Sequence, residues 1–181
     1  VILRSDDSSE RKYCVVFEDD VDLLPEFSSV VSSLIARDLC GFGMIRLQGR
    51  RRGLGVSVEK VTESHGVHVK FTRVTGSACY IIGRSGAQKF LDTLLPMTVP
   101  LDHAFNRPLQ TGVRIGFIHP YVAKVRAVAS TISAVRGPNR VETDDKVGPI
   151  GTVSVLAWRT HSEVSRGIYG LVEMTRRLVG V

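Results

Sequence analysis

The stretch VVFEDDVDLLPEF, residues 15–27, decides the predicted fold, because it leads from an apolar segment through four acids into the start of a helix. The apolar segment YCVVF at 13–17 is short and rich in β-branched residues, which is typical of a strand buried in a parallel sheet. Pro25 favours the first turn of a helix, and apolar residues then recur at helical spacing as far as Leu39. The order of strand, acidic loop and helix predicts an α/β sheet.

The acidic loop contains Glu18, Asp19, Asp20 and Asp22. Carboxylates this close repel one another, which costs free energy unless they are solvated or a cation lies among them. Carboxylates separated by one residue can converge on one hard divalent cation that keeps positions open for phosphate oxygens. A solvated loop whose charge favours the dipole of the following helix explains the same residues, and the spacing alone does not separate the two interpretations.

Strands and helices alternate along the rest of the chain. Further strands are predicted at 43–49, 67–73, 78–82 and 113–120, and a helix at 85–95 with a capping box formed by Ser85 and Gln88. Residues 130–149 are polar and predict a long loop. We expect one α/β domain over residues 1–160, with a mostly parallel central sheet and flanking helices, followed by a basic amphipathic helix over 161–181.

Composition narrows the classes of partner. The chain has 181 residues, 43% of them hydrophobic, with a net charge of +6 and a pI near 9.5, which favours an anionic partner. Nucleic acid is not expected, because the aromatic residues, 7% of the chain, are not interleaved with the basic stretches. The three cysteines lie far apart and indicate a reducing compartment. With no apolar run of about 20 residues, we expect a cytoplasmic protein.

A second motif, TGSACYIIGRSGAQKFLDTLLPMTVPLDHAF at residues 75–105, combines a Gly-Ser entry, a short strand, a helix and an Asp after a Pro. Together with VVFEDDV it resembles glycosyltransferase family 25, the family of lipooligosaccharide and procollagen galactosyltransferases. In that family an apolar strand ends in Glu-Asp-Asp-Val, a Gly-x-x-x-Tyr-Ile-Ile segment leads to a Gly-Ala helix start, and a Pro-x-Asp follows. The later AVASTISAV is similar to the family's Ser-x-Ile element, so the resemblance covers roughly residues 13–135.

The resemblance implies a single GT-A-like, Rossmann-like fold, a UDP-hexose donor that is commonly UDP-galactose, and a Mn²⁺ or Mg²⁺ ion. It makes Asp20 the metal ligand, with Asp22 as a supporting acid. It assigns Glu18 and Asp19 to the donor side of the site, where Glu18 meets the ribose or a metal-bound water. The acceptor implied is a cell-surface glycan or glycolipid such as lipooligosaccharide.

Three further parts of the site are expected outside the acidic loop. Asp102 is the candidate general base of inverting transfer, although an Asp at this position also caps a short helix well. Gly76 and Ser77 are expected to let the backbone approach the donor. Arg50, the first of three consecutive arginines, neutralises the diphosphate or belongs to an exposed loop.

Two alternatives stay open beside the transferase. The family begins with a strand and a Gly-x-x-Gly-Cys-x-x-Ser-His segment that do not precede Val1. A truncated or inactive glycosyltransferase-like domain, which binds without catalysis, is therefore the second hypothesis. A receiver-type phosphoryl-transfer domain is the third, and the strand ends at Gly83 and Pro120 argue against it because they lack its phosphoacceptor Asp. The C-terminal helix could also contact the inner face of a membrane that holds the acceptor.

Overall fold

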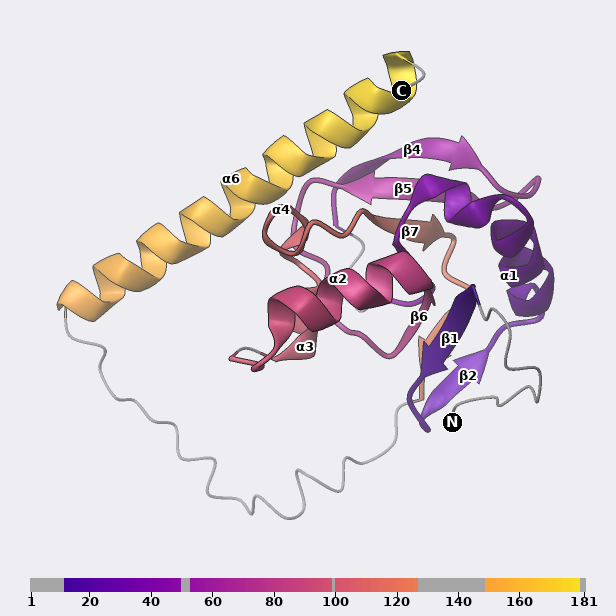
Figure 1. Cartoon of the computed structure of the whole chain (residues 1–181), viewed down its shortest axis with the longest axis horizontal. Helices are drawn as coiled ribbons and strands as arrows, with labels where there is room; N and C mark the ends of the chain where they lie inside the picture. The colour runs from indigo at the N-terminus through magenta and orange to yellow at the C-terminus, as the bar shows by residue number, and fades with distance from the viewer. Residues whose placement is uncertain (1–11, 50–52, 99, 127–148, 180–181) are drawn as a thin grey trace.

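The computed structural model describes residues 12–49, 53–98, 100–126 and 149–179, which form one mixed α/β domain (Figure 1). Its main sheet has six strands in the order β1-β6-β3-β7-β5-β4. The bounds of these strands are β1 Tyr13–Phe17, β3 Met44–Arg46, β4 Gly55–Lys60, β5 Gly66–Lys70, β6 Cys79–Gly83 and β7 Ile115–His119. A separate ribbon pairs β2 (Val21–Leu23) with β8 (Ala123–Val125).

Helices cover the sheet and its ends. The longer helices are α1 (Phe27–Ala36), α2 (Arg84–Leu94) and α6 (Pro149–Val179). The short ones are α3 (Leu101–Ala104), α4 (Pro108–Thr111) and the 3-10 helix η1 (Asp38–Gly41). No helix among the described residues has the length and apolarity needed to cross a bilayer.

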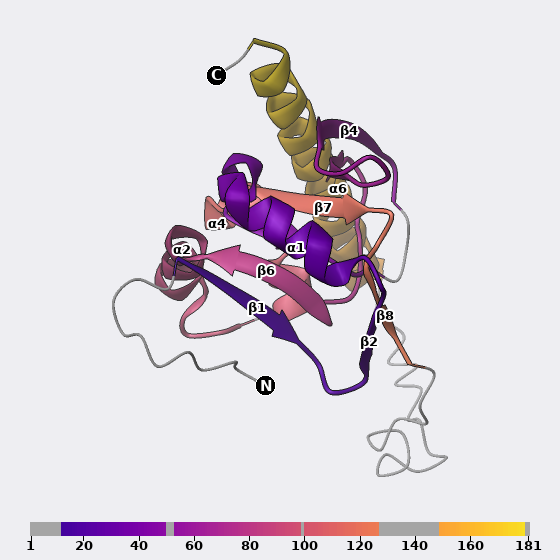
Figure 2. The ribbon, with the colours of Figure 1, turned by 90° about the vertical axis from the view of Figure 1, so that its right-hand side faces the viewer.

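The pairing of the strands corrects the expectation of a mostly parallel sheet. Only β3 with β7 is parallel, while β1 with β6, β6 with β3, β7 with β5 and β5 with β4 are antiparallel. The reason lies in the connections: β4 and β5 form a hairpin, and β6 enters between β1 and β3 in the opposite direction (Figure 2). Antiparallel strands need only a short turn, whereas parallel ones need a crossover.

Three strands of the main sheet, β1, β3 and β7, nevertheless run in the same direction, as in a parallel sheet. Because β6 is antiparallel to both of its neighbours, β1 and β3 run in the same direction, and β7 runs parallel to β3. The strands β1, β3 and β7 therefore end on the same side of the sheet, which we call the carboxyl end of the sheet. Open α/β sheets bind ligands at this end.

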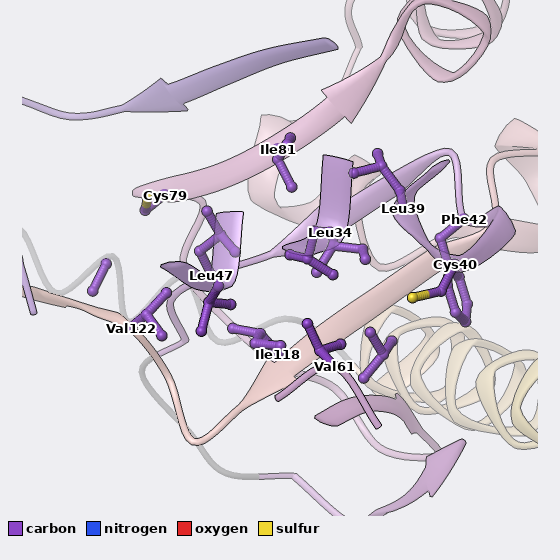
Figure 3. Close-up of a cluster of buried hydrophobic side chains, with 14 of the residues drawn as sticks. Leu34, Leu39, Cys40, Phe42, Leu47, Val61, Cys79, Ile81, Ile118 and Val122 are labelled. Carbon is purple, nitrogen blue, oxygen red and sulfur yellow. The ribbon is translucent and has the colours of Figure 1, made fainter. Parts of the chain in front are cut away.

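Two apolar clusters hold the sheet between its helices. On one face Leu34 of α1 packs with Leu39, Ile81 and Ile118, all of them fully buried (Figure 3). On the other face the cluster contains Met44, Ile82, Phe90, Phe105, Val113, Ile115 and Phe117 beneath α2 and α3. Alternate residues of β3 and β7 supply the two clusters, as the two-residue period of a strand requires.

The helix α6 begins at Pro149, twelve residues before the predicted boundary at 161, and most of the predicted loop at 130–149 lies outside the described residues. Its attachment to the domain is polar. The hydroxyl of Tyr169 accepts a hydrogen bond from the backbone N–H of Ile115 at 2.7 Å and donates one to its carbonyl at 3.1 Å. Glu173 accepts hydrogen bonds from Nε of Arg114, both 3.0 Å long.

The helix α2 forms where it was predicted, but it begins differently. Gly83 is the N-cap residue and no side chain caps the helix, so the predicted capping box is wrong. Ser85 lies inside the first turn, and the side chain of Gln88 donates instead to Asp92 at 2.8 Å. The helix starts earlier than the capping pattern indicates because Gly83 ends β6 and leads directly into it.

Candidate functional site

The acidic loop lies at the carboxyl end of the sheet. The N–H of Glu18 donates to the carbonyl of Ala78 at 2.9 Å, which ties the end of β1 to the entry of β6. The carbonyl of Asp20 accepts from the N–H of Arg126 at 2.8 Å, just after β8. Glu18 and Asp19 are exposed, whereas Asp20 is half-buried. The backbone of the loop is therefore anchored at Glu18 and at Asp20.

The individual carboxylates differ in their suitability for a divalent cation. The Oδ1 atom of Asp20 is buried and has no hydrogen-bond partner among the described residues, as expected for an oxygen that receives a ligand. Asp22 instead accepts from Nε of Arg126 at 2.9 Å in a half-exposed ion pair. No group of three or more His, Cys, Asp or Glu side chains among the described residues could hold an ion alone. Of the carboxylates predicted to hold a metal, Asp20 therefore keeps a buried oxygen without a partner among the described residues, whereas Asp22 is paired.

The segment before β6 and the helix α3 form a second part of the site. The side chain of Asn106 joins them, because Oδ1 accepts from the N–H of Val74 at 3.2 Å and Nδ2 donates to the carbonyl of Asp102 at 2.6 Å. Arg73 and His103 are also in contact, with 2.7 Å between Nη2 and Nε2. Asp102 lies in the first turn of α3, and its side chain caps no N–H there.

Gly76 and Ser77 lie in the segment that these contacts hold. Gly76 has a positive φ of 94°, a backbone conformation that residues with a side chain rarely adopt. Ser77 is half-buried, and Ala78 follows with its carbonyl bonded to Glu18. The segment therefore connects the acidic loop on one side with Asp102 on the other. Arg50, the remaining predicted residue, lies outside the described residues.

A buried arginine that the sequence interpretation did not assign lies at the end of β3. Arg46 is 0% exposed; its Nη1 donates to the carbonyl of Val74 at 3.0 Å, and its guanidinium carbon lies 5.2 Å from the ring centre of Phe117. Burial lowers the pKa of Arg46 to about 10, while Tyr121 and Asp102 act in the opposite direction.

The carboxyl end of the sheet carries the buried carboxylate oxygen of Asp20 and the buried guanidinium of Arg46, and α3 carries a second carboxylate, that of Asp102. The structure links Glu18 and Asp20 to the segment with Gly76 and Ser77 through backbone bonds, and links this segment to Asp102 through Asn106. Asp22 is not linked to these residues, because its carboxylate is paired with Arg126. The sequence signal for Arg46 was a basic residue inside the apolar segment 43–49.

A cavity of about 530 Å³ opens on the opposite side of the sheet, between η1, the start of β3 and the start of α2. Its charged lining residues are Lys12, Asp38, Arg84, Lys89 and Arg114. Lys12 and Asp38 pair with each other, and Lys89 donates to the carbonyl of Gly112 at 3.1 Å. We place the candidate site at the carboxyl end instead, because the buried and unpartnered groups Asp20 Oδ1 and Arg46 Nε and Nη2 lie there.

Comparison with known proteins assigns no family to the chain. No protein-family model matches the sequence, and no curated protein shows significant similarity to it. The resemblance to glycosyltransferase family 25 therefore rests on the motifs within residues 13–135, and any function must be argued from the geometry of the site.

Proposed function

We propose that this chain is a metal-dependent glycosyltransferase of GT-A type. It transfers a hexose, galactose in the first instance, from a UDP-hexose donor to a cell-surface glycan or glycolipid acceptor such as lipooligosaccharide, with inversion at the anomeric carbon. Asp102 acts as the general base. Asp20 holds the Mn²⁺ or Mg²⁺ ion, and Glu18, Asp19, Gly76 and Ser77 line the donor.

The position of Asp20 is the observation that carries the proposal. Its Oδ1 is buried, has no hydrogen-bond partner among the described residues and lies where β1, β3 and β7 end. Burial of an ionised oxygen without a partner costs free energy, so the feature favours a bound ligand over a solvated loop. A sugar nucleotide suits this place because its transfer requires stabilisation of a departing diphosphate.

In the proposed reaction a hydroxyl oxygen of the acceptor attacks the anomeric carbon of the donor sugar. The bond between this carbon and the diphosphate oxygen breaks, and the electron pair leaves with UDP. Asp102 takes the proton of the acceptor hydroxyl as the new glycosidic bond forms. The ion, when bound, supplies positive charge to the diphosphate. The hydrogen bond from Asn106 to the carbonyl of Asp102 fixes the helix turn that carries the base.

The helix α6 is the part of the molecule that bears on the acceptor. An exposed apolar face of α6 supports contact with a membrane that carries a lipid-linked acceptor, since Val164, Ile168 and Leu171 are each at least 50% exposed. The exposed Arg159 and Arg176 on the same helix would meet anionic lipid headgroups.

A second candidate is a glycosyltransferase-like domain that binds its ligand without catalysis. The ion pair between Asp22 and Arg126 favours it, because this pair removes one of the two expected metal ligands. With Asp20 as the remaining one, a metal would depend largely on the phosphates of the donor. Such a domain would bind UDP but release no sugar from UDP-galactose.

Calorimetric titration with UDP, with and without Mn²⁺, tests the proposal. We expect Mn²⁺-dependent binding that is weakened at least about tenfold, or about 1.4 kcal/mol, by Asp20→Ala. Asp92→Ala is the matched control, because Asp92 is an exposed carboxylate on α2 that accepts only from Gln88. Absence of UDP binding with Mn²⁺, or equal binding by the Asp20→Ala protein, would contradict the proposal. Binding without sugar release would select the second candidate.

A further inference from the structure

Two buried side chains and one half-buried side chain at the carboxyl end of the sheet have buried polar atoms without a hydrogen-bond partner. They are Nε and Nη2 of Arg46, Oε1 of Gln48 and the hydroxyl of Tyr121, none of which has a partner among the described residues. We propose that Arg46, Gln48 and Tyr121 form a binding site for an oxyanion, a phosphate or carboxylate group, carried by a molecule with hydroxyl groups. The proposal rests on this cluster and does not require glycosyl transfer.

The buried charge of Arg46 is the first argument. The residue is 0% exposed, and only Nη1 has a hydrogen bond, to the carbonyl of Val74. None of the described carboxylates lies within ion-pair distance of the guanidinium. A charged group taken out of water without a partner is strongly unfavourable, and native proteins keep such groups where a ligand or reaction uses them. Each unused N–H of Arg46 would donate to an anionic oxygen, and two such bonds make a bidentate contact.

The three residues come from the ends of two neighbouring strands. Leu47 continues the strand pattern beyond β3, because its N–H donates to Cys79 at 3.0 Å and its carbonyl accepts from Val122 at 3.2 Å. The side chains of Arg46 and Gln48 therefore point to the same face. Tyr121 follows β7, which is the parallel neighbour of β3, and Arg46 and Tyr121 influence each other's pKa.

The hydroxyl of Tyr121 lies close to the backbone of Gly49. A Cβ atom added to Gly49 would lie 2.5 Å from the hydroxyl oxygen of Tyr121, so this hydroxyl lies directly over the backbone that follows Gln48. A glycine at position 49 thus allows the phenol to reach the end of β3.

The chemistry of the three side chains defines the ligand. Arg46 only donates hydrogen bonds, Gln48 Oε1 only accepts them, and the hydroxyl of Tyr121 does either. An isolated oxyanion would satisfy Arg46 but not Gln48. A phosphorylated or carboxylated sugar satisfies both, because its oxyanion accepts from Arg46 while a hydroxyl donates to Gln48.

Metal-free titration of the whole chain tests the inference. Glucose 6-phosphate and glucuronate serve as probes of the phosphate and carboxylate sources, in EDTA and at constant ionic strength, with melting temperature and calorimetry as readouts. We expect at least one probe to raise the melting temperature of the wild type. Arg46→Met should weaken that probe at least tenfold. Without a probe, the melting temperature of this variant should equal or exceed that of the wild type, because Met removes the buried charge while filling a similar volume.

Two variants complete the test. Arg84→Met, which removes an exposed arginine beside the opposite cavity, should leave probe binding unchanged. Arg46→Lys should bind the probe more weakly than the wild type and more tightly than Arg46→Met, because Lys keeps the charge but not the bidentate fork. The inference is overturned if neither probe binds, if Arg84→Met abolishes binding while Arg46→Met does not, or if Arg46→Met lowers the unliganded melting temperature by several degrees. Since EDTA is present and no nucleotide is used, each result is independent of the Mn²⁺-dependent UDP titration.

Discussion

At the scale of single residues, the charged side chains at the carboxyl end of the sheet differ in how deeply they are buried. Glu18 and Asp19 are exposed to solvent, Asp20 is half-buried with an unused oxygen, and Arg46 is enclosed. A negatively charged ligand with a bound cation would meet the carboxylate of Asp20 through the cation and the guanidinium of Arg46 through its own negative charge. Asp102 has a different role in the proposed function, because it acts on the acceptor rather than on the diphosphate.

Replacement of Asp102 by Asn separates binding from chemistry. The amide keeps the shape of the side chain but cannot take a proton, so we expect UDP binding within about threefold of the wild type and a rate of UDP release from UDP-galactose lowered about 10²–10⁴-fold. The helix α3 should stay intact, because the Asn106 bond uses the carbonyl of residue 102. Asp92→Asn is the matched control. A release rate equal to that of the wild type would show that Asp102 is a helix residue only.

At the scale of elements, the backbone of α2 at Gly86 lies in close contact with the backbone at Gly43. A Cβ atom on Gly86 would overlap the carbonyl oxygen of Gly43, whereas one on Gly167 in α6 would have no heavy atom within 4 Å. Both glycines lie in helices, and neither has a positive φ. The same substitution should therefore have opposite effects at the two positions.

We expect Gly86→Ala to lower the free energy of unfolding by about 1–3 kcal/mol, because the helix must move away from the backbone of Gly43, which precedes β3. Gly167→Ala should raise it by about 0.4–1 kcal/mol, because alanine restricts the unfolded chain and fits the open helix surface. Urea unfolding followed by circular dichroism measures both. Stabilisation of similar size at both positions would show that helix propensity, rather than contact with Gly43, governs the effect.

The sequence predicted the elements whose apolar residues recur with a clear period. The segments at 13–17, 43–49, 67–73, 78–82 and 113–120 overlap β1, β3, β5, β6 and β7, and helices form after Pro25 and near Ser85. The strand β4 was missed because glycines and arginines before it indicated a loop. The parallel order failed because local pattern does not specify which strand becomes the neighbour, and β6 entered between β1 and β3.

Some residues of the candidate site could be located from the sequence, and others could not. The acidic loop could be located because it directly follows the predicted strand β1. Arg46 was not assigned, because a basic residue in the apolar segment 43–49 does not reveal the contacts with Val74 and Phe117, which lie far away in the chain. Asp22 could not be excluded for a related reason, because its partner Arg126 approaches only through the β2–β8 ribbon.

At the scale of the whole molecule, α6 is oriented opposite to the usual amphipathic helix. Arg166 and Glu173 face the domain and are 8% and 1% exposed, whereas Leu171 and Leu178 are 54% and 79% exposed. The sequence predicted two faces but not which of them packs. The difference follows from the contacts available on the domain, where Arg114 and the backbone of Ile115 offer polar partners.

The ion pair between Arg114 and Glu173 should therefore be a main attachment of α6. Nη2 of Arg114 lies 2.6 Å from Oε2 of Glu173, and the side chains are 32% and 1% exposed. We expect Glu173→Gln to lower the free energy of unfolding by about 1–3 kcal/mol, because the neutral amide leaves Arg114 without its charged partner. A double-mutant cycle with Arg114→Met isolates this pair from the second contact of Glu173, with Arg176 at 3.1 Å. Its coupling should be about 0.5–3 kcal/mol. Additive effects of the two substitutions would mean that Tyr169 and the other contacts of α6 attach the helix without this pair.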